Sequence, residues 1–335
     1  MKMKRYRYTT LWLLVALLAT ACSSDGGEMP STPPANTQDE INIKAQVWQV
    51  MQGAPRRAHT YDNVAALNAE AHFTCTAYNA GTLTAYIPTT TVDWNSTQWQ
   101  FNNGASHYYW PLPATNGGAW PSLDFFGYMP ATRPSYITAG PTYSADHNVT
   151  FTCSSLPVTN AEQGSSLKEF MFGMALGQNE VNAGSGVPLT FQHPFARIKL
   201  QLAASHPNVT IHSIKFRSIK NNGNFTYNNS ASTSTWVPSG DATDFVLSLT
   251  GDAAIFDDNP ASETPIGDYY IMIPQDWAGE IVVNADCLYW GKKKNYPSLT
   301  TTVPTNWQPG YSYTYTFNIS PDDLIVNISK FTEQW

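Results

Sequence analysis

Residues 187–202 read VPLTFQHPFARIKLQL, and this stretch decides the fold class. In its second half, apolar and polar residues alternate, so that Arg197, Lys199 and Gln201 separate the apolar positions. A period of two places the polar side chains on one face of a β-strand and the apolar ones on the other. One wet face and one buried face are typical of an antiparallel sheet, so we expect this strand to cover a core.

The same period of two recurs along most of the chain. It is seen in six further segments, residues 41–47, 83–87, 245–249, 269–273, 281–287 and 311–319. A change of phase between Ile211 and Ile214 predicts a β-bulge. Helix-forming residues gather only at residues 63–71, and Gly, Pro, Asn, Ser and Thr fill the gaps. The sequence therefore predicts an all-β protein of antiparallel β-sandwich type.

A turn-rich segment, GQNEVNAGSGVP at residues 177–188, interrupts the strands. A chain of 335 residues is long enough to form two compact domains. We therefore predict an N-terminal β-sandwich over residues 41–186 and a C-terminal β-sandwich over residues 187–335.

The N-terminus has the pattern of an export signal. Four basic residues within the first seven precede an apolar run, residues 11–21, that is too short to span a bilayer. Residues 1–21 are therefore a predicted signal peptide, and Ala19-Thr20-Ala21 before Cys22 resembles a bacterial lipobox. We expect Cys22 to be lipidated, for example with palmitate, and residues 22–40, rich in Pro, Gly and Ser, to form a flexible tether. Ordinary signal-peptidase cleavage before Cys22 is the alternative.

Charge excludes two classes of partner. The signal peptide contains four of the 18 basic residues and none of the 25 acidic ones, so its removal changes the net charge from −7 to −11. An acidic surface disfavours nucleic acid and anionic lipid as partners. We therefore expect contact with a membrane through the lipid anchor only.

Three cysteines remain after Cys22, and each falls in a strand-like run. They are Cys75, Cys153 and Cys287. An odd number permits at most one internal disulfide, which would join Cys75 to Cys153. Buried free thiols are the favoured alternative, since cysteine serves well as a small apolar core residue.

No pattern in the chain indicates catalysis. The seven histidines are scattered without His-x-His or His-Glu-x-x-His spacing, and no paired Cys-x-x-Cys motif is present. A G-x-S-x-G nucleophile motif and a Gly-rich phosphate loop are absent too, and nothing nominates a pair of carboxylates for glycoside hydrolysis. We expect a protein that is not an enzyme and that holds neither metal nor cofactor.

Four tryptophans fall within 27 residues that are otherwise polar between the rings. They are Trp94, Trp99, Trp110 and Trp120. One interpretation is a ligand-facing surface, because flat rings cover apolar sugar faces while Asn and Gln supply hydrogen bonds. The favoured interpretation is that large rings fill the corners of a loop-rich sandwich.

Several motifs follow one another in a characteristic order: YYWPL, LDFFGYMP, FMFGMALG, VPLTFQHPFARIKLQL, YYIMIPQDW and finally PGYSYTYTFNI. In this order the chain resembles the fimbrillin-like lipoproteins, the subunits of type V pili. The resemblance covers nearly all of the mature chain. It implies two transthyretin-like β-sandwiches in tandem, in agreement with the strand pattern.

The resemblance also implies how subunits would assemble. In that family an arginine-specific protease cuts an Arg-Ala motif that follows the first strand, which here matches Arg57-Ala58, with Arg56 as an alternative cleavage residue. Loss of the strand leaves unpaired backbone groups, which a strand of another subunit can pair with. The family's donor is the C-terminal segment, here LIVNISKFTEQW, with Leu324, Val326 and Ile328 on one face and Trp335 at the end.

Two functions of different class are therefore open. The first is a non-catalytic pilus subunit or adhesin, anchored at the outer membrane, exposed at the cell surface and then incorporated into a fimbrium. Its partners would be identical or different pilus subunits and a host glycan or protein. The second is a monomeric surface lipoprotein that binds glycans through the clustered tryptophans and never loses a strand.

Overall fold

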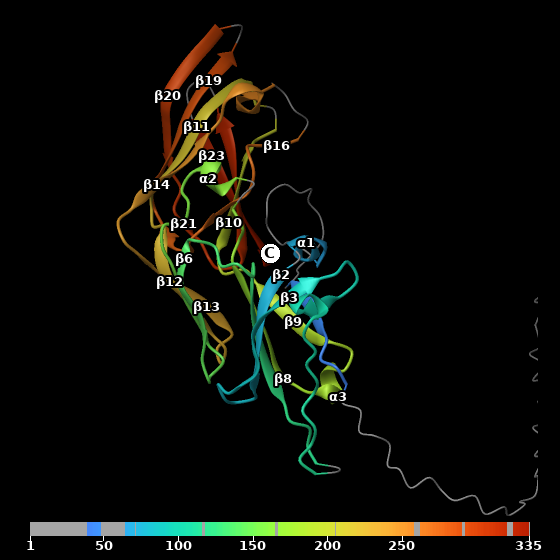
Figure 1. Cartoon of the computed structure of the whole chain (residues 1–335). Coiled ribbons are helices and arrows are strands. Elements are labelled where there is room, and N and C mark those ends of the chain that lie inside the picture. Colours follow the sequence, from blue (N-terminus) through green and yellow to red (C-terminus); the bar gives the residue numbers. More distant parts are fainter. Residues whose placement is uncertain are drawn as a thin grey trace, which may run out of the picture. The chain divides into compact units, whose positions relative to one another are not determined.

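A computed structural model of the chain describes residues 39–47, 64–70, 72–115, 118–164, 167–204, 206–257, 262–289, 292–319 and 324–334. These residues all belong to one compact unit, residues 38–335 (Figure 1). Several predicted features lie outside the described residues: the signal peptide, Cys22, most of the tether, Arg56, Arg57 and Trp335. None of the described helices has the length and apolar character needed to cross a membrane.

Seven strands form a closed barrel. In order around the wall they are β1 (Ile43–Val47), β4 (Trp99–Phe101), β3 (Ala85–Trp94), β2 (His72–Asn79), β5 (Leu123–Met129), β8 (Met171–Gln178) and β9 (Val187–Gln192). A short 3-10 helix, η1 (Asn102–Gly104), follows β4. The helix α1 (Val64–Glu70) contacts β1, and it agrees with the helical propensity predicted at residues 63–71.

The barrel wall is buried on both faces where β5 and β8 lie. The adjacent residues Phe125 and Phe126 point in opposite directions, the first into the barrel and the second onto its outer face. Met171 and Phe172 do the same on β8. Because both faces of these strands are largely shielded from water, LDFFGYM and MFGMALG are mostly apolar runs without a polar alternation.

A four-stranded sheet covers this outer face. Its strands, in order, are β13 (Thr233–Ser239), β12 (Asn222–Asn228), β7 (Val149–Cys153) and β6 (Ile137–Tyr143). Aromatic rings form the layer between sheet and barrel. Phe151 stacks on Phe225 at 4.6 Å between ring centroids, and Phe172 of the barrel lies 5.4 Å from Phe225.

The remaining strands form a C-terminal sandwich. One sheet contains β16 (Thr264–Pro265), β10 (Ala196–Leu202), β22 (Tyr311–Ile319) and β23 (Leu324–Gln334), with β17 (Tyr270–Met272) also paired to β10. The other contains β14 (Thr243–Ser248), β11 (Asn208–Ile219), β19 (Glu280–Tyr289) and β20 (Lys292–Thr302), with β15 (Ile255–Phe256) paired to β11. A hydrophobic core, separate from the barrel core and from the aromatic layer, fills the space between these two sheets.

Short elements complete the fold. They are α2 (Asn160–Gln163), α3 (Glu180–Ala183), the 3-10 helix η2 (Gly251–Ala254) and the paired strands β18 (Asp276–Trp277) and β21 (Thr305–Asn306). The predicted bulge is confirmed, because the register of β11 against β19 shifts between Ile211 and Ser213.

Two expectations for the opening stretch need correction. The pairing of β10 with β22 is parallel, with Arg197 opposite Ser312, whereas β10 pairs antiparallel with β16 and β17. Arg197 was expected on a wet face, yet it is only 8% exposed. Its Nε donates to the Ser312 hydroxyl at 3.2 Å, and its guanidinium lies 4.6 Å from the centre of the Tyr269 ring. These contacts allow the charge to be buried.

Strand pairing crosses the predicted domain boundary at residue 186. The strand β9 follows that boundary, yet it pairs with β1 and β8 and closes the barrel. The strand β12 also follows it and pairs with β7. The division into residues 41–186 and 187–335 stays a prediction. Strands from the two predicted parts pair with each other in the barrel and in the four-stranded sheet.

The cysteines occupy three different cores. Cys75 lies in the barrel, Cys153 in the aromatic layer and Cys287 in the C-terminal sandwich, and all three are buried free thiols. This confirms the favoured interpretation of their strand-like surroundings. Burial raises the pKa of Cys75 and Cys153 to about 12 and that of Cys287 to about 11, which keeps them protonated and unreactive.

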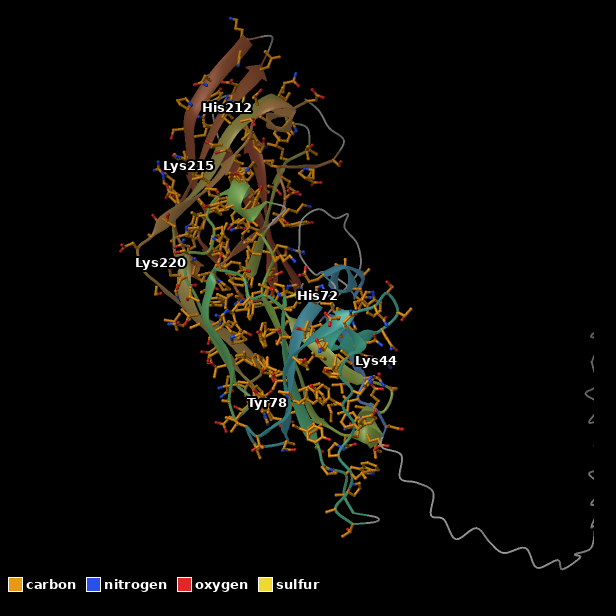
Figure 2. The ribbon with its side chains drawn as sticks, in the orientation of Figure 1. Lys44, His72, Tyr78, His212, Lys215 and Lys220 are labelled. Carbon is orange, nitrogen blue, oxygen red and sulfur yellow. The ribbon has the colours of Figure 1, made fainter. Side chains whose placement is uncertain are left out.

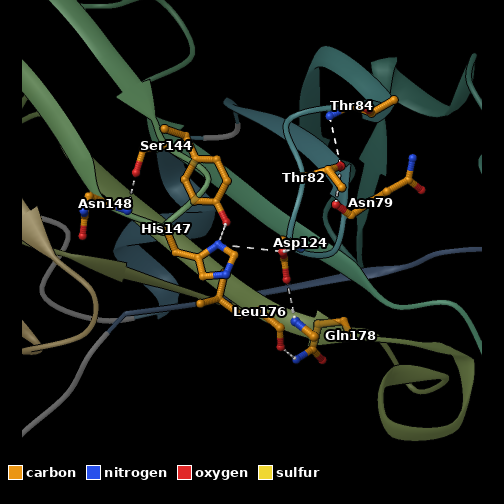
Figure 3. Close-up of polar contacts among 12 residues, drawn as sticks. Asn79, Thr82, Thr84, Asp124, Ser144, His147, Asn148, Leu176 and Gln178 are labelled. Carbon is orange, nitrogen blue, oxygen red and sulfur yellow. Dashed lines mark hydrogen bonds and ion pairs between the residues drawn. The ribbon is translucent and has the colours of Figure 1, made fainter.

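A buried carboxylate on β5 binds two backbone N–H groups of the barrel (Figure 3). Asp124, only 2% exposed, accepts a hydrogen bond from the backbone N–H of Gly81 at 3.0 Å and from that of Gly177 at 2.8 Å. Both glycines have positive φ, a conformation that glycine adopts without strain. His147 Nδ1 lies 3.8 Å from the same carboxylate and contacts the Tyr143 hydroxyl. Asp124 thus links β5 with the turn that follows β2 and with the end of β8.

Candidate functional site

The first strand of the barrel is the candidate functional site. Along its whole length β1 pairs in parallel with β9, from Ile43 opposite Val187 to Val47 opposite Phe191. On its other side it meets β4 at one position only, where Ile43 faces Trp99. The backbone of β1 therefore pairs mostly with β9. Its pairing with β4, at a single position, is the least extensive strand pairing that β1 makes.

Apolar side chains on alternate residues hold β1 in the wall. Ile41, Ile43 and Ala45 are 2%, 5% and 5% exposed and belong to the barrel core. Asn42 and Lys44, between them, are exposed. Complete burial of an isoleucine side chain stabilises a protein by about 1.5–3 kcal/mol. Burial of these three side chains therefore stabilises the strand and the residues just before it in the wall.

Polar contacts anchor the chain just before β1. The backbone N–H of Ile41 donates to the Tyr108 carbonyl at 2.7 Å, and Glu40 Oε1 lies 2.8 Å from His107 Nδ1. The neighbouring carboxyl groups of Asp39 and Glu180 are close enough to affect each other. Burial and the Asp39 carboxylate raise the pKa of the Glu180 carboxyl.

The predicted cleavage residues fall between β1 and α1. The strand ends at Val47 and the helix begins at Val64, so Arg56 and Arg57 belong to the connection, which lies outside the described residues. A cut at either arginine would separate β1 from the rest of the barrel strands in the covalent chain.

The predicted donor segment forms β23, an edge strand. It pairs antiparallel with β22 from Leu324 opposite Ile319 to Gln334 opposite Tyr311. Val326 and Ile328 are half-buried and pack against the C-terminal core, whereas Ile325 between them is 49% exposed. In this chain the segment is therefore paired with its own subunit, and the alternation predicted for it is present.

The structure separates the four clustered tryptophans. Trp110 is fully buried and Trp99 is 4% exposed, and both belong to the barrel core. Their burial removes them from any ligand-facing surface, and the core-filling interpretation holds for this pair. Trp94 and Trp120 are half-buried and remain accessible. A local sequence signal could have identified Trp99 as a buried residue. It lies in the short alternating strand WQF, in which the first and third side chains are buried.

Reactive side chains do not gather at this site. Within the described part of the chain, no three His, Cys, Asp or Glu side chains come together as a metal-binding group. The arrangement at β1 offers main-chain donors and acceptors and a stripe of buried apolar side chains instead. Its chemistry is that of strand pairing.

These features define a class, a β-rich protein whose candidate site is a strand in a barrel wall. The chain belongs to the fimbrillin-like family, whose family model matches residues 57–335. Fimbrillin-like proteins are structural subunits of fimbriae and are found at the cell surface. The resemblance seen in the sequence is thereby confirmed. The match begins at Arg57 and leaves β1 outside it.

Solved structures give distant similarities. A putative cell adhesion protein from Bacteroides ovatus is 15% identical, with 89% of this chain and 98% of that one covered and a TM-score of 0.49. The tip fimbrial protein Mfa3 from Porphyromonas gingivalis, with a C-terminal truncation, is 10% identical over 78% and 93%, with a TM-score of 0.40. The fimbrial anchor protein Mfa2 from the same organism is 11% identical over 88% and 98%, with a TM-score of 0.33. No curated protein matches the chain.

Proposed function

We propose that this chain is a subunit or adhesin of a type V pilus that assembles by strand exchange. It would be lipidated on Cys22 and carried to the outer membrane, where cleavage after Arg57, or after Arg56, precedes incorporation into a fimbrium. Cleavage would free β1 to leave, and a strand from another subunit would take its place between β4 and β9. The protein would carry no catalytic site in this role.

The observation that supports this proposal most is the way β1 is held. It is a wall strand of a closed barrel, yet its backbone pairs mainly with β9. Its covalent link to the other barrel strands runs through the connection that contains the arginines. Its departure would leave unpaired backbone groups on β9 beside a bared apolar stripe. Unpaired backbone groups next to apolar surface are unfavourable in water, so a replacement strand would bind there.

The proposed donor has the matching pattern. Leu324, Val326 and Ile328 have the same i, i+2, i+4 spacing as Ile41, just before β1, and Ile43 and Ala45 within it. A strand in the empty position would therefore direct three apolar side chains into the barrel core. The donor starts from a sheet edge, so its departure from β22 breaks one ladder only.

Treatment of the lipid-free mature protein with an arginine-specific protease tests the proposal. We expect N-terminal sequencing to find Ala58, or Arg57, as the new first residue, and a ladder of oligomers to appear on a denaturing gel. Replacement of both Arg56 and Arg57 by alanine should abolish the ladder, whereas the matched control Arg217→Ala should not. A normal ladder from the double variant would refute the proposal.

A second experiment addresses the donor. A chain that ends at residue 323 lacks β23, so after cleavage it should accept a strand but not donate one. Added in excess to cleaved full-length subunits, it should shorten the ladder. Mass spectrometry of the protein isolated from cells would test the anchor, because it reports both the lipid on Cys22 and the true N-terminus.

A further inference from the structure

A hollow of about 540 Å³ lies against β1. One side of it is formed by residues 42–46 on and beside β1 (Lys44 in Figure 2). The other sides come from α1, from the end of β3 and the turn to β4, and from Ser185 before β9. We call this space the β1 hollow. Its volume is within the range of small-molecule sites.

A tryptophan ring forms part of the lining. Trp94 is half-buried and packs against the barrel core, with its ring centroid 5.4 Å from that of Trp99 at an angle of 53°. Its indole N–H has no hydrogen-bond partner within the described residues. A tryptophan that is fixed on one side and open on the other is a platform for a flat apolar surface, and it carries a donor at its edge.

Amide side chains surround this ring. Gln46, Asn68 and Gln98 line the hollow, and none of their side chains is hydrogen-bonded to another described residue. The Oδ1 atom of Asn68 is buried and has no partner in the described part of the structure. A buried carbonyl oxygen without a donor is unfavourable, and a ligand hydroxyl would satisfy it.

Charge is almost absent from the lining. Lys44 is the one ionisable residue among those that line the hollow, and its Nζ lies 3.3 Å from the Ser185 hydroxyl. An anionic or cationic ligand would find little to pair with. A neutral ligand with both hydroxyl groups and apolar faces fits a ring surrounded by amides, and a pyranose has both.

We propose that the β1 hollow binds a neutral saccharide of one or two pyranose rings and that the bound saccharide retains β1 in the barrel. The sugar would lie on Trp94, donate a hydroxyl hydrogen bond to Asn68 Oδ1, accept one from the amide of Gln98, and contact Gln46 of β1. The second half of this statement rests on the strand exchange proposed above, whereas the binding itself does not.

The coupling follows from the geometry. Because one side of the hollow belongs to β1, the complete site exists only while the strand is in place. A ligand that binds one of two states shifts the equilibrium toward that state. At a sugar concentration 100 times its dissociation constant, the population from which β1 has left should fall roughly 100-fold.

Binding is tested first with the intact full-length chain. An array of neutral mono- and disaccharides identifies the probe, and calorimetric titration then gives its affinity. We expect Trp94→Ala and Gln98→Ala each to weaken binding at least tenfold, while Trp120→Ala, a half-buried tryptophan outside the hollow, leaves it unchanged. Gln98 is exposed, so its variant keeps the fold. Failure of every neutral sugar to bind, or equal affinity in all three variants, would overturn the proposal.

The coupling is tested by the release of β1 after cleavage at the arginines. The rate at which the N-terminal peptide leaves should fall in the presence of the identified sugar, and Gln98→Ala should remove this effect. Unchanged release in the presence of bound sugar would overturn the retention half only. If the peptide never leaves, even without sugar, strand exchange itself fails while the titration still decides the binding site.

Discussion

The two outermost described strands of this chain are held in opposite ways. The first, β1, lies between two neighbours in a closed wall and directs the buried residues Ile43 and Ala45 inward. The last, β23, lies at a sheet edge with β22 as its one paired neighbour, and its inward residues Val326 and Ile328 are only half-buried. A strand in the wall therefore gains more buried apolar surface than the same strand at the edge. This difference would favour transfer from the edge of one subunit into the wall of another.

The largest effect is expected from a buried charge in β1. In Ile43→Asp the carboxylate would face the barrel core, so we expect a loss of about 3–5 kcal/mol in the free energy of unfolding. Urea denaturation measures it. The control is Gln46→Asp, which puts the same group on an exposed position of the same strand. Equal losses in the two variants would contradict the barrel position of β1.

Truncation of the half-buried residues of β23 should have a smaller effect. We expect the double variant Val326→Ala and Ile328→Ala to lose about 2 kcal/mol in the free energy of unfolding, since these side chains are only partly removed from water. Backbone amides of β23 should exchange faster with deuterium, while those of β1 should not. Ile325→Ala, at a position 49% exposed, is the matched control and should change neither measurement.

Acid should weaken the C-terminal sandwich through one carboxylate. Lys293, at 2.7 Å, together with Asn295 and His212, lowers the pKa of Asp286 to about 2 (His212 in Figure 2). An unfolded aspartate titrates near 3.9, so the unfolded chain takes up the proton first. This contribution to stability is therefore complete above about pH 4 and is lost as the pH falls toward 2.

The corresponding measurement is the thermal midpoint between pH 5 and pH 2. We expect Asp286→Asn to reduce its decrease relative to the unaltered chain. Parallel curves for the two proteins would show that the ion pair with Lys293 contributes nothing to stability.

The smallest effect concerns the chain before β1. Because the pKa of Glu180 is raised, the folded protein holds its proton at a pH where the unfolded chain has released it. This contribution is present below about pH 4.3, the ordinary glutamate value, and is lost as the pH rises through the folded value. We therefore expect the peptide that contains β1 to leave more slowly in mild acid than at neutral pH. Glu180→Gln should remove part of this difference, and an unchanged difference would exclude Glu180 as its source.

Local pattern predicted much of the fold. The alternation in YSYTYTFNI gives β22, whose residues Tyr313, Tyr315 and Phe317 are all buried. The phase shift in β11 gives the bulge, and the strand-like setting of each cysteine gives its burial. Each of these depends on neighbours a few residues away, so the sequence alone contains the signal.

Strand partners could not be predicted in the same way. Nothing in VPLTFQ indicates that β9 closes the barrel while β10, four residues later, joins the C-terminal sandwich. The parallel pairing of β10 and the burial of Arg197 both depend on β22, a strand more than 100 residues further along the chain. Neither could be predicted from the residues near Arg197. At the candidate site, β1 was predicted as a strand, but the hollow beside it combines segments that only the fold brings together.

The double role of β5 and β8 has a mechanical consequence. One pair of strands serves both as barrel wall and as the floor of the aromatic layer, with Phe125 and Phe126 on its two faces. A load applied along the chain cannot open one of these cores without disturbing the other. A fibre of such subunits would therefore open the barrel core and the aromatic layer together, and these two layers would not separate one after the other.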